Sequence, residues 1–167
     1  MPLLYSEMQV FRQWWLWVII LVPTTILLYV IIGQINEGNL SLVIVFCILG
    51  VGFPLFMYKL QLKTEVTEKG IHIRFFPFHW KWIFFKFDDI ELTYAITYNP
   101  LMDYGGWGIR YGFKDRGKAY NVSGNQGVLI KFKRGKDVLI GSSNHDKLRQ
   151  IINERVSALN EKIKANS

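Results

Sequence analysis

Hydrophobic and polar positions divide this chain into two uncharged apolar runs near its start and a longer stretch of alternating residues behind them. The first run, Trp14–Gly33, has 20 residues and the second, Leu40–Tyr58, has 19, and neither contains Asp, Glu, Lys or Arg. A hydrocarbon core about 30 Å thick needs about 20 helical residues to cross it, so each run is long enough to span a membrane. The pattern therefore predicts a transmembrane helical hairpin in residues 1–60, with spans at about 14–33 and 40–58, and a second domain in residues 61–167.

A cleaved signal peptide is the alternative for the first run. Such a peptide has a basic start, an apolar stretch of about 7–15 residues and a small-residue cleavage site. Residues 1–13 carry only Glu7 and Arg12 as charges, and no A-x-A-like site follows the run. We expect the first run to remain in the protein as a span.

The charges beside the apolar runs predict the orientation of the hairpin. Lys and Arg close to the ends of spans favour the cytoplasmic side of the membrane. Arg12 precedes the first run, Lys59 and Lys63 follow the second, and the connecting loop carries only Glu37. We therefore expect an integral protein of the inner (cytoplasmic) membrane with both termini in the cytoplasm.

Behind the apolar runs, short segments of alternating hydrophobicity are typical of strands joined by turns. Seven or eight of them at hairpin spacing favour an antiparallel barrel or sandwich. The segments are Leu60–Thr67, Ile71–Phe76, Trp80–Phe87, Ile90–Tyr98, Trp107–Tyr111, Ala119–Val122, Val128–Lys133 and Asp137–Gly141.

The period then changes from strand to helix. Ser143 and Asp146 have the spacing of a capping box, in which side chains bond the free amides of a first helical turn. A stripe of apolar residues on one face predicts an amphipathic helix over residues 144–164 that covers one open end of the barrel. The stripe consists of Leu148, Ile151, Ile152, Val156, Leu159 and Ile163.

Several motifs make the chain resemble the bacterial pleckstrin-homology-like (PH-like) membrane proteins. The similarity covers nearly the whole chain, and its most specific part is Gly105-Gly106-Trp107-Gly108. The other stretches are Thr64–Thr67 with Gly70-Ile71, Arg74–Phe78, Asp88–Ile90, Gly117–Gly124, Gly127-Val128 and Leu139–Ser142. The resemblance implies an α+β protein, in which a two-helix transmembrane hairpin precedes a PH-like seven-stranded split β-barrel capped by a C-terminal helix. It implies no enzymatic activity, and the family is mostly of unknown function.

Two details limit what this resemblance implies. The lipid-binding eukaryotic branch of the fold carries a basic signature on its first hairpin, but position 76 is Phe here, so phosphoinositide specificity is not expected. The glycines at 105, 106 and 108 are either a phosphate cradle or positions that need positive φ at a bulge. No Gly-Lys-Ser/Thr follows them, so we favour the conformational interpretation.

The net charge of +7 lies entirely in residues 61–167, because the two cations of residues 1–60 balance two acids. A basic domain beneath an anionic leaflet is attracted to that surface. Helix-turn-helix, zinc-finger and RNA-binding signatures are absent from the sequence, so nucleic acid is not an expected partner.

Two clusters are candidate contact sites. The segment Phe75–Phe87 holds eight aromatic residues among its 13 and is either a wedge into the headgroup layer, a protein contact, or a buried hairpin. Its candidate membrane or partner contacts are Phe76, Phe78, Trp80, Lys81, Trp82 and Lys86. On the last hairpin the candidate anion contacts are Lys131, Lys133, Arg134 and Lys136, for which a solvated, charged edge strand is the alternative.

Catalytic chemistry is not predicted. It would require a nucleophile with its base, paired carboxylates or metal ligands. His72, His79 and His145 form no H-E-x-x-H motif, and the single Cys47 lies in the second apolar run. We expect no enzymatic activity, no metal and no cofactor.

Two functions therefore remain open. The first is a protein-interaction or scaffold module held at the cytoplasmic membrane face, with a protein partner of unknown identity. The second is a sensor or binder of anionic lipid headgroups.

Overall fold

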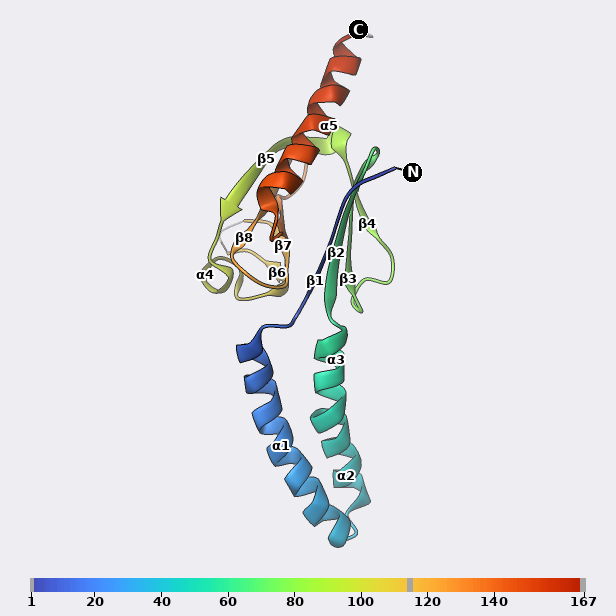
Figure 1. The fold of residues 1–167 in the computed structure, drawn as a ribbon, viewed down its shortest axis with the longest axis vertical. Coiled ribbons are helices and arrows are strands. Elements are labelled where there is room, and N and C mark those ends of the chain that lie inside the picture. Colours follow the sequence, from blue (N-terminus) through green and yellow to red (C-terminus); the bar gives the residue numbers. More distant parts are fainter. Residues whose placement is uncertain (1, 114–115, 166–167) are drawn as a thin grey trace. The chain divides into compact units, whose positions relative to one another are not determined.

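The computed structural model describes residues 2–113 and 116–165. They form two compact units, each described here by itself (Figure 1). The helical unit is Val10–Leu60, and the sheet unit combines Met1–Gln9 with Gln61–Ser167. The sheet unit is thus interrupted in sequence by the helical unit.

The helical unit is an antiparallel pair of apolar helices. One is α1 (Trp14–Asn36), and the other runs through α2 (Leu40–Cys47), η1 (Ile48–Gly52) and α3 (Phe53–Lys59). Both are long and apolar enough to cross a membrane, judged by length and composition, which confirms the two predicted helices. At the open end of the pair, Arg12 lies 5.8 Å from the centre of the Tyr58 ring and Trp17 packs edge-on against it.

A π-helical turn, η1, interrupts the second helix. Pro54 has no N–H to donate to the carbonyl four residues earlier, that of Gly50, and the wider turn forms there. Gly50 is buried against α1, because a Cβ at this position would lie 3.6 Å from Leu27 Cβ. A Cβ at position 50 would thus make an ordinary van der Waals contact with α1.

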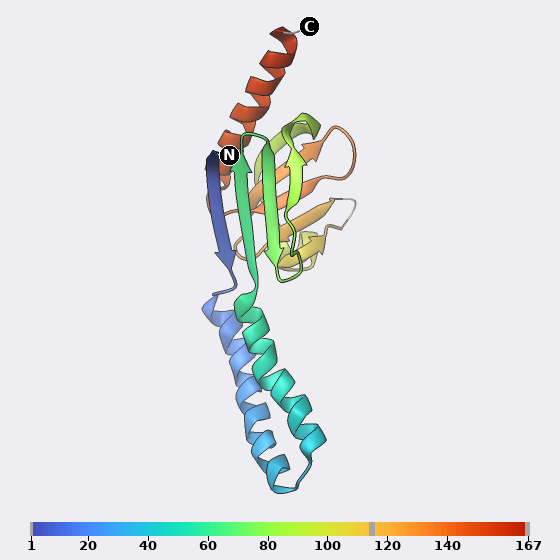
Figure 2. The same ribbon diagram turned by 90° about the vertical axis from the view of Figure 1, so that its right-hand side faces the viewer.

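The first sheet of the sheet unit has the order β1-β2-β3-β4. Its strands are β1 (Leu3–Val10), β2 (Gln61–Thr67), β3 (Gly70–Phe76) and β4 (Ile83–Lys86). Figure 2 shows β1 and β2 as antiparallel neighbours. The sequence analysis assigned all of residues 1–60 to the hairpin and did not predict β1, whereas the structure places it at the edge of this sheet.

The second sheet has the order β5-β8-β9-β7-β6. Its strands are β5 (Ile90–Thr97), β6 (Gly108–Tyr111), β7 (Lys118–Asn121), β8 (Gln126–Phe132) and β9 (Val138–Gly141). The short helices η2 (Phe87–Asp89) and α4 (Pro100–Tyr104) flank β5. β7 pairs with β9 in parallel, so this sheet is mixed rather than antiparallel.

The predicted seven-stranded barrel is therefore wrong, although the α+β class is confirmed. The structure has nine strands in two open sheets among its described residues. Alternation in the sequence marks which residues form strands, but it says nothing of which strands pair, and pairing decides whether a sheet closes.

The core lies between the inner faces of the two sheets and is completed by α5 (His145–Ala165), which packs on β5 and β8. Leu148 and Ile152 of the predicted stripe are fully buried, and Ile151, Val156 and Leu159 are half-buried. The side chain of Ile163 lies outside the described part of the chain. The helix thus covers a sheet face instead of plugging a barrel. The buried strand residues include Leu62, Val66, Ile71, Ile73, Phe75, Val128, Ile130, Leu139 and Ile140.

The glycines after α4 have the positive φ angles that the sequence predicted. Gly105, Gly106 and Gly108 have φ of 70°, 119° and 117°. Gly105 ends α4 in the left-handed conformation, and its N–H and that of Gly106 bond the carbonyls of Leu101 and Pro100. A residue with a Cβ is strained in this conformation, which explains glycine here.

Candidate functional site

The aromatic segment Phe75–Phe87 divides between core and surface. Phe75 and Phe87 are buried, and the Phe85 ring lies 5.4 Å from that of Phe132 between the sheets. In contrast, Phe78 and Trp80 in the β3–β4 loop (residues 77–82) are 59% and 79% exposed. The buried-hairpin interpretation therefore holds for the ends of the segment and fails for the loop.

The β3–β4 loop lies at the end of the first sheet where the second apolar helix joins it. The register pairs Gln61, the first residue of β2, with Phe76, the last residue of β3. Gln61 in turn follows the last residue of α3, Lys59, by two positions. The Trp80 ring packs edge-on at 5.8 Å against that of Phe76, and Lys81 beside it is exposed.

His79 anchors the loop to the second sheet. The His79 ring lies 5.8 Å from that of Tyr120 on β7. The backbone N–H of His79 donates to the Phe75 carbonyl at 2.8 Å. Burial lowers the pKa of His79, and the nearby Lys118 ammonium lowers it further. The ring is therefore neutral at neutral pH and acts as a packing group.

Lys86, predicted to act together with Lys81, is not near it. Lys86 pairs with Gly70, at the end of β3 opposite to Phe76. β4 thus separates the two cations by its own length, which places them at opposite ends of the first sheet.

The outer face of the first sheet carries a cation–aromatic cluster. Trp82 is its centre: the guanidinium carbon of Arg74 and the ammonium of Lys63 lie 4.9 and 5.6 Å from its ring. His72 packs edge-on against Trp82 and stacks on Phe84 with ring centres 4.6 Å apart. Period-two alternation places these outward residues opposite the buried Leu62, Ile71 and Ile73, so we call Lys63, His72, Arg74, Trp82 and Phe84 the outer-face cluster.

The basic candidates of the last hairpin lie far from the β3–β4 loop. All four are exposed, and Lys131 lies 5.8 Å from the ring of Tyr94 on β5. Phe132 pairs with Ile90, and Ile90 begins β5 only four residues after Lys86. Because Lys86 marks the end of the first sheet opposite to the loop, the basic hairpin belongs to that opposite end. The structure therefore does not bring the aromatic and the basic candidates together.

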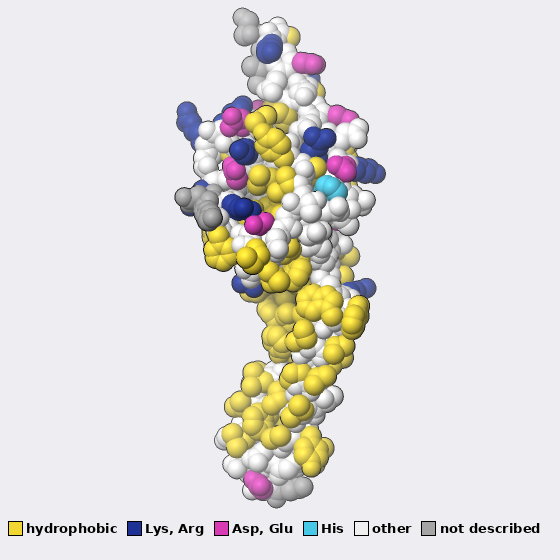
Figure 3. Space-filling model, turned by 90° about the vertical axis from the view of Figure 1, so that its left-hand side faces the viewer, with side chains coloured by type: hydrophobic (Ala, Val, Ile, Leu, Met, Phe, Trp, Pro, Cys, Tyr) yellow, Lys and Arg dark blue, Asp and Glu magenta, His cyan; other side chains and the backbone are white. Residues whose placement is uncertain are grey.

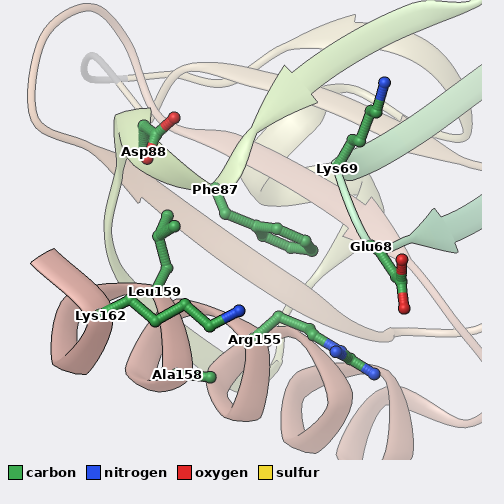
Figure 4. Close-up of a pocket in the computed structure, with 8 residues that line it drawn as sticks. All are labelled: Glu68, Lys69, Phe87, Asp88, Arg155, Ala158, Leu159 and Lys162. Atoms are coloured by element: carbon green, nitrogen blue, oxygen red, sulfur yellow. The ribbon is translucent and has the colours of Figure 1, made fainter.

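A groove of about 470 Å³ opens at this opposite end, between the β2–β3 turn, η2 and α5 (Figure 4). Phe87 forms its buried floor, and the cations of Arg155 and Lys162 reach over it from α5. Carboxylates also line it, so its charges are mixed. The full lining is Glu68, Lys69, Phe87, Asp88, Arg155, Ala158, Leu159 and Lys162.

Glu7 on β1 receives five hydrogen bonds, most of them from the segment before α5. Ser142 Oγ donates at 2.6 Å, and Ser143 donates from both N and Oγ at 2.9 and 2.6 Å. The Tyr5 hydroxyl donates at 2.6 Å and Gln9 Nε2 at 3.1 Å. Gln9 also donates to the Gly141 carbonyl at 2.7 Å. The strand before the first apolar helix is thus bonded to the start of the C-terminal helix.

These bonds determine the ionisation of Glu7. Burial alone raises the pKa of the Glu7 carboxyl, but the donors on Ser142, Ser143 and Tyr5 outweigh it and lower the pKa below its ordinary value. Glu7 is therefore ionised at neutral pH. Ser143, predicted to act in a capping box with Asp146, donates its hydroxyl proton to Glu7, a bond that the motif did not predict.

The histidines do not come together in the fold. His72 stacks on the outer face of the first sheet, His79 packs on β7, and His145 lies 3.6 Å from Asp146 at the start of α5. Within residues 2–113 and 116–165, no three His, Cys, Asp or Glu side chains are arranged to hold a metal ion.

Comparison with known families identifies one match, the family of unknown function DUF6141, whose model covers residues 2–159. The chain belongs to this family. The matched region includes β1, both apolar helices and nearly all of the sheet unit. No curated protein and no solved structure matches the chain.

Sequence reasoning missed the two features that link distant parts of the sheet unit, β1 and the Glu7 bonds. A signal was present, because residues 3–10 alternate and carry Tyr5, Glu7 and Gln9 on one face. The strand pattern of residues 3–10 was overlooked because a short polar segment before an apolar helix is ordinarily a flexible flank.

Proposed function

We propose that this family member is a non-enzymatic integral membrane protein whose sheet unit binds the headgroup layer of its own bilayer through the β3–β4 loop. The observation that carries the proposal is the pairing of Gln61 with Phe76. This register attaches the loop to the chain that leaves the second apolar helix.

Chain length then limits how far the loop can lie from the membrane. Two residues reach at most about 7 Å, from Lys59 to Gln61. Paired Cα atoms in an antiparallel sheet lie about 5 Å apart. Phe76, where the loop begins, therefore stays within about 13 Å of the end of the apolar helix, whatever angle the sheet unit adopts.

The side chains of the loop suit a headgroup layer. Indole rings settle at the boundary between lipid and water, and Trp80 with Phe78 offers two exposed aromatic rings there. Lys81 adds attraction to anionic phosphates, which is about 1 kcal/mol for a cation near the surface. With these side chains among the lipid headgroups, the β3–β4 loop would hold the sheet unit against the membrane.

A protein-interaction role is the second candidate function, and the outer-face cluster favours it. The cluster combines exposed Phe84 with the Arg74 guanidinium held over Trp82, and aromatic residues and arginine are enriched at protein interfaces. A contact dominated by apolar and aromatic packing would resist salt, whereas lipid attraction through Lys81 would weaken with it.

The proposal also includes the orientation of the hairpin, the membrane in which it lies and the relationship to PH-like proteins. We propose the inner membrane as the location, and the charges around the hairpin support the cytoplasmic orientation of both termini. We also propose a distant PH-like relationship without a closed barrel, on the grounds that mostly antiparallel strands precede one C-terminal helix.

The test places a probe in the loop of the full-length protein. In a Cys47→Ser background, Trp80→Cys is labelled with an environment-sensitive fluorophore and reconstituted into vesicles containing anionic lipid. We expect blue-shifted emission and strong quenching by a lipid-phase quencher. A probe at Lys69→Cys, in the β2–β3 turn at the other end of β2, is the aqueous control.

Charge variants make the test specific. Lys81→Glu should red-shift the probe emission, and the matched variant Lys86→Glu should leave it unchanged, because Lys86 lies at the opposite end of β4. If the probe at position 80 reports the same aqueous surroundings as the probe at position 69, the proposed function is wrong.

A further inference from the structure

The sheet unit carries a second exposed apolar element, the short helix α4. Leu101 and Met102 on it are 60% and 74% exposed, and Phe113 beside it is 57% exposed. Phe113 belongs to this element because its N–H donates to the Asp103 carbonyl and its ring lies 3.7 Å from where a Gly105 Cβ would be. We define the α4 patch as Leu101, Met102 and Phe113.

We infer that the α4 patch is a second membrane contact, which inserts into the headgroup layer together with the β3–β4 loop. The inference rests on the proposed function, and it names a site that the sequence analysis did not consider. It requires that α4 is held rigidly, lies at the same end of the sheet unit as the loop, and has suitable charges around it.

Local bonds hold α4 in place. The side chain of Asn99 accepts the N–H groups of Leu101 and Met102 at 3.1 Å each and so caps the start of the helix. At the other end Tyr104 is buried, with its ring 5.8 Å from that of Tyr98. With both ends anchored, the outward direction of Leu101 and Met102 is a fixed feature of the fold.

A chain of contacts links α4 to the β3–β4 loop. His79 of the loop packs on Tyr120 of β7. Asn121, the next residue of β7, donates to the Tyr98 hydroxyl at 3.0 Å, and Tyr98 packs on Tyr104 of α4. Figures 1 and 2 both show α4 and the loop at the same end of the sheet unit.

The charged groups around the α4 patch largely offset one another, and one exposed arginine lies near it. Arg116 forms a 2.7 Å ion pair with Asp103 and so offsets the acid nearest to the patch, while the Arg110 side chain is exposed close by. Figure 3 shows hydrophobic side chains gathered over this end of the sheet unit, with charged groups higher on the same face. Exposed apolar side chains with an arginine beside them, and no unpaired acid among them in the described part of the chain, suit a surface that lies in a membrane interface.

A bilayer explains this patch better than a second protein does. The same end of the sheet unit carries the loop that the chain keeps within about 13 Å of the apolar helix end. A protein partner on α4 would have to share that narrow space with lipid. Two separate contacts would also stop the sheet unit from turning about a single loop, leaving the groove at the opposite end facing the aqueous phase.

The experiment uses the full-length protein in vesicles containing anionic lipid, again in the Cys47→Ser background. Met102→Cys carries the fluorophore, Trp80→Cys reports on the loop, and Lys69→Cys is the aqueous control. We expect the probe at 102 to be quenched several-fold more by a lipid-phase quencher than the probe at 69. Leu101→Ser in the same background should reduce that quenching, because it removes the neighbouring apolar anchor.

The outcomes separate the two proposals. A probe at 102 that is aqueous while the probe at 80 is in lipid overturns this inference and leaves the proposed function intact. An aqueous probe at 80 overturns the proposed function and, with it, the two-contact arrangement. Protection of the probe at 102 from both lipid-phase and aqueous quenchers would mean that protein covers α4, and it also overturns the inference. Because Met102 is exposed, its substitution leaves the core untouched.

Discussion

At the scale of single residues, the Glu7 carboxylate accepts five hydrogen bonds. One carboxylate accepts from Tyr5 and Gln9 on its own strand and from Ser142 and Ser143 before α5. Hydrogen bonds to an ionised acceptor are about twice as strong as those between neutral groups. Glu7 therefore holds β1 and the start of α5 together across more than 130 positions of sequence.

We expect Glu7→Gln to lower the free energy of unfolding of the sheet unit by about 1–3 kcal/mol. The amide offers one accepting oxygen where the carboxylate offers two, and it carries no charge. Pulse proteolysis in urea on the detergent-solubilised full chain would measure the loss. Glu154→Gln, at an exposed position of α5, is the matched control and should change stability by no more than about 0.5 kcal/mol.

The pH dependence of this effect has a definite sign. The pKa of Glu7 is lowered in the folded protein, so as pH falls the unfolded chain binds this proton first. The stabilisation is therefore complete above the ordinary glutamate value of 4.5 and is lost as pH falls through the lower folded-state pKa. The stability difference between wild type and Glu7→Gln should shrink on acidification; a difference that grows would contradict an ionised Glu7.

At the scale of elements, β1 makes the sheet unit discontinuous. The strand precedes the first apolar helix, yet it pairs with β2, which follows the second. Removal of the first run as a signal peptide would therefore remove β1 and the Glu7 bonds as well. The helical unit is an insertion into a β-hairpin, and the fold of the sheet unit requires both sides of that insertion.

This arrangement predicts that residues 61–167 alone are less stable than a chain in which β1 is restored. Because β1 and β2 are antiparallel neighbours, an Asn-Gly turn can replace residues 11–60. We expect the joined chain to be more stable by about 2–4 kcal/mol, from burial of Tyr5 and the bonds to Glu7. Urea unfolding followed by circular dichroism would compare the two.

The joined chain with Tyr5→Ala is the control, since it keeps the strand but loses the buried ring. Its stability should fall between those of the two parent chains. Equal stability of the joined chain and the 61–167 fragment would mean that β1 is a dispensable edge strand.

At the scale of the whole molecule, the pairing of β1 with β2 restricts how the hairpin can cross a membrane. Both strands belong to one sheet, so the two ends of the helical unit must emerge on the same side. An even number of crossings satisfies this requirement. We expect the charges to select the side, because Arg12 and Lys59 flank the open end and only Glu37 lies in the loop.

We expect a reporter fused after Ser167 to be active only in the cytoplasm, and a tag inserted between Asn36 and Gly38 to be accessible only from outside. Inserting two or three Lys residues beside Glu37 should reduce the fraction of molecules in this orientation, because the loop would then compete for the positive side. Protease accessibility of the tag in cells and in inverted vesicles measures that fraction. A cytoplasmic tag in the unmodified chain would contradict the charge argument.

Local patterns in the sequence were enough to predict most of the elements, but not β1 or the short helix α4. The two apolar runs, the eight strand segments after them, the C-terminal helix and the positive φ of Gly105 all follow from composition or periodicity within a few consecutive residues. Such features depend on neighbours in the chain: a helix repeats every 3.6 residues, a strand every two, and only glycine adopts positive φ without strain.

Only the tertiary structure decided which of these elements meet. It placed β1 beside β2 across 50 intervening residues, paired β7 with β9 in parallel, and left both sheets open. It also separated Lys81 from Lys86 and brought α4 to the end that carries the β3–β4 loop. Strand pairing depends on the burial and hydrogen bonding of the whole sheet, and a period of two in one strand is compatible with many partners. The aromatic residues of the β3–β4 loop were recognisable in the sequence, but their position beside the end of α3 and beside α4 depends on strand pairing, and so it became visible only in the folded chain.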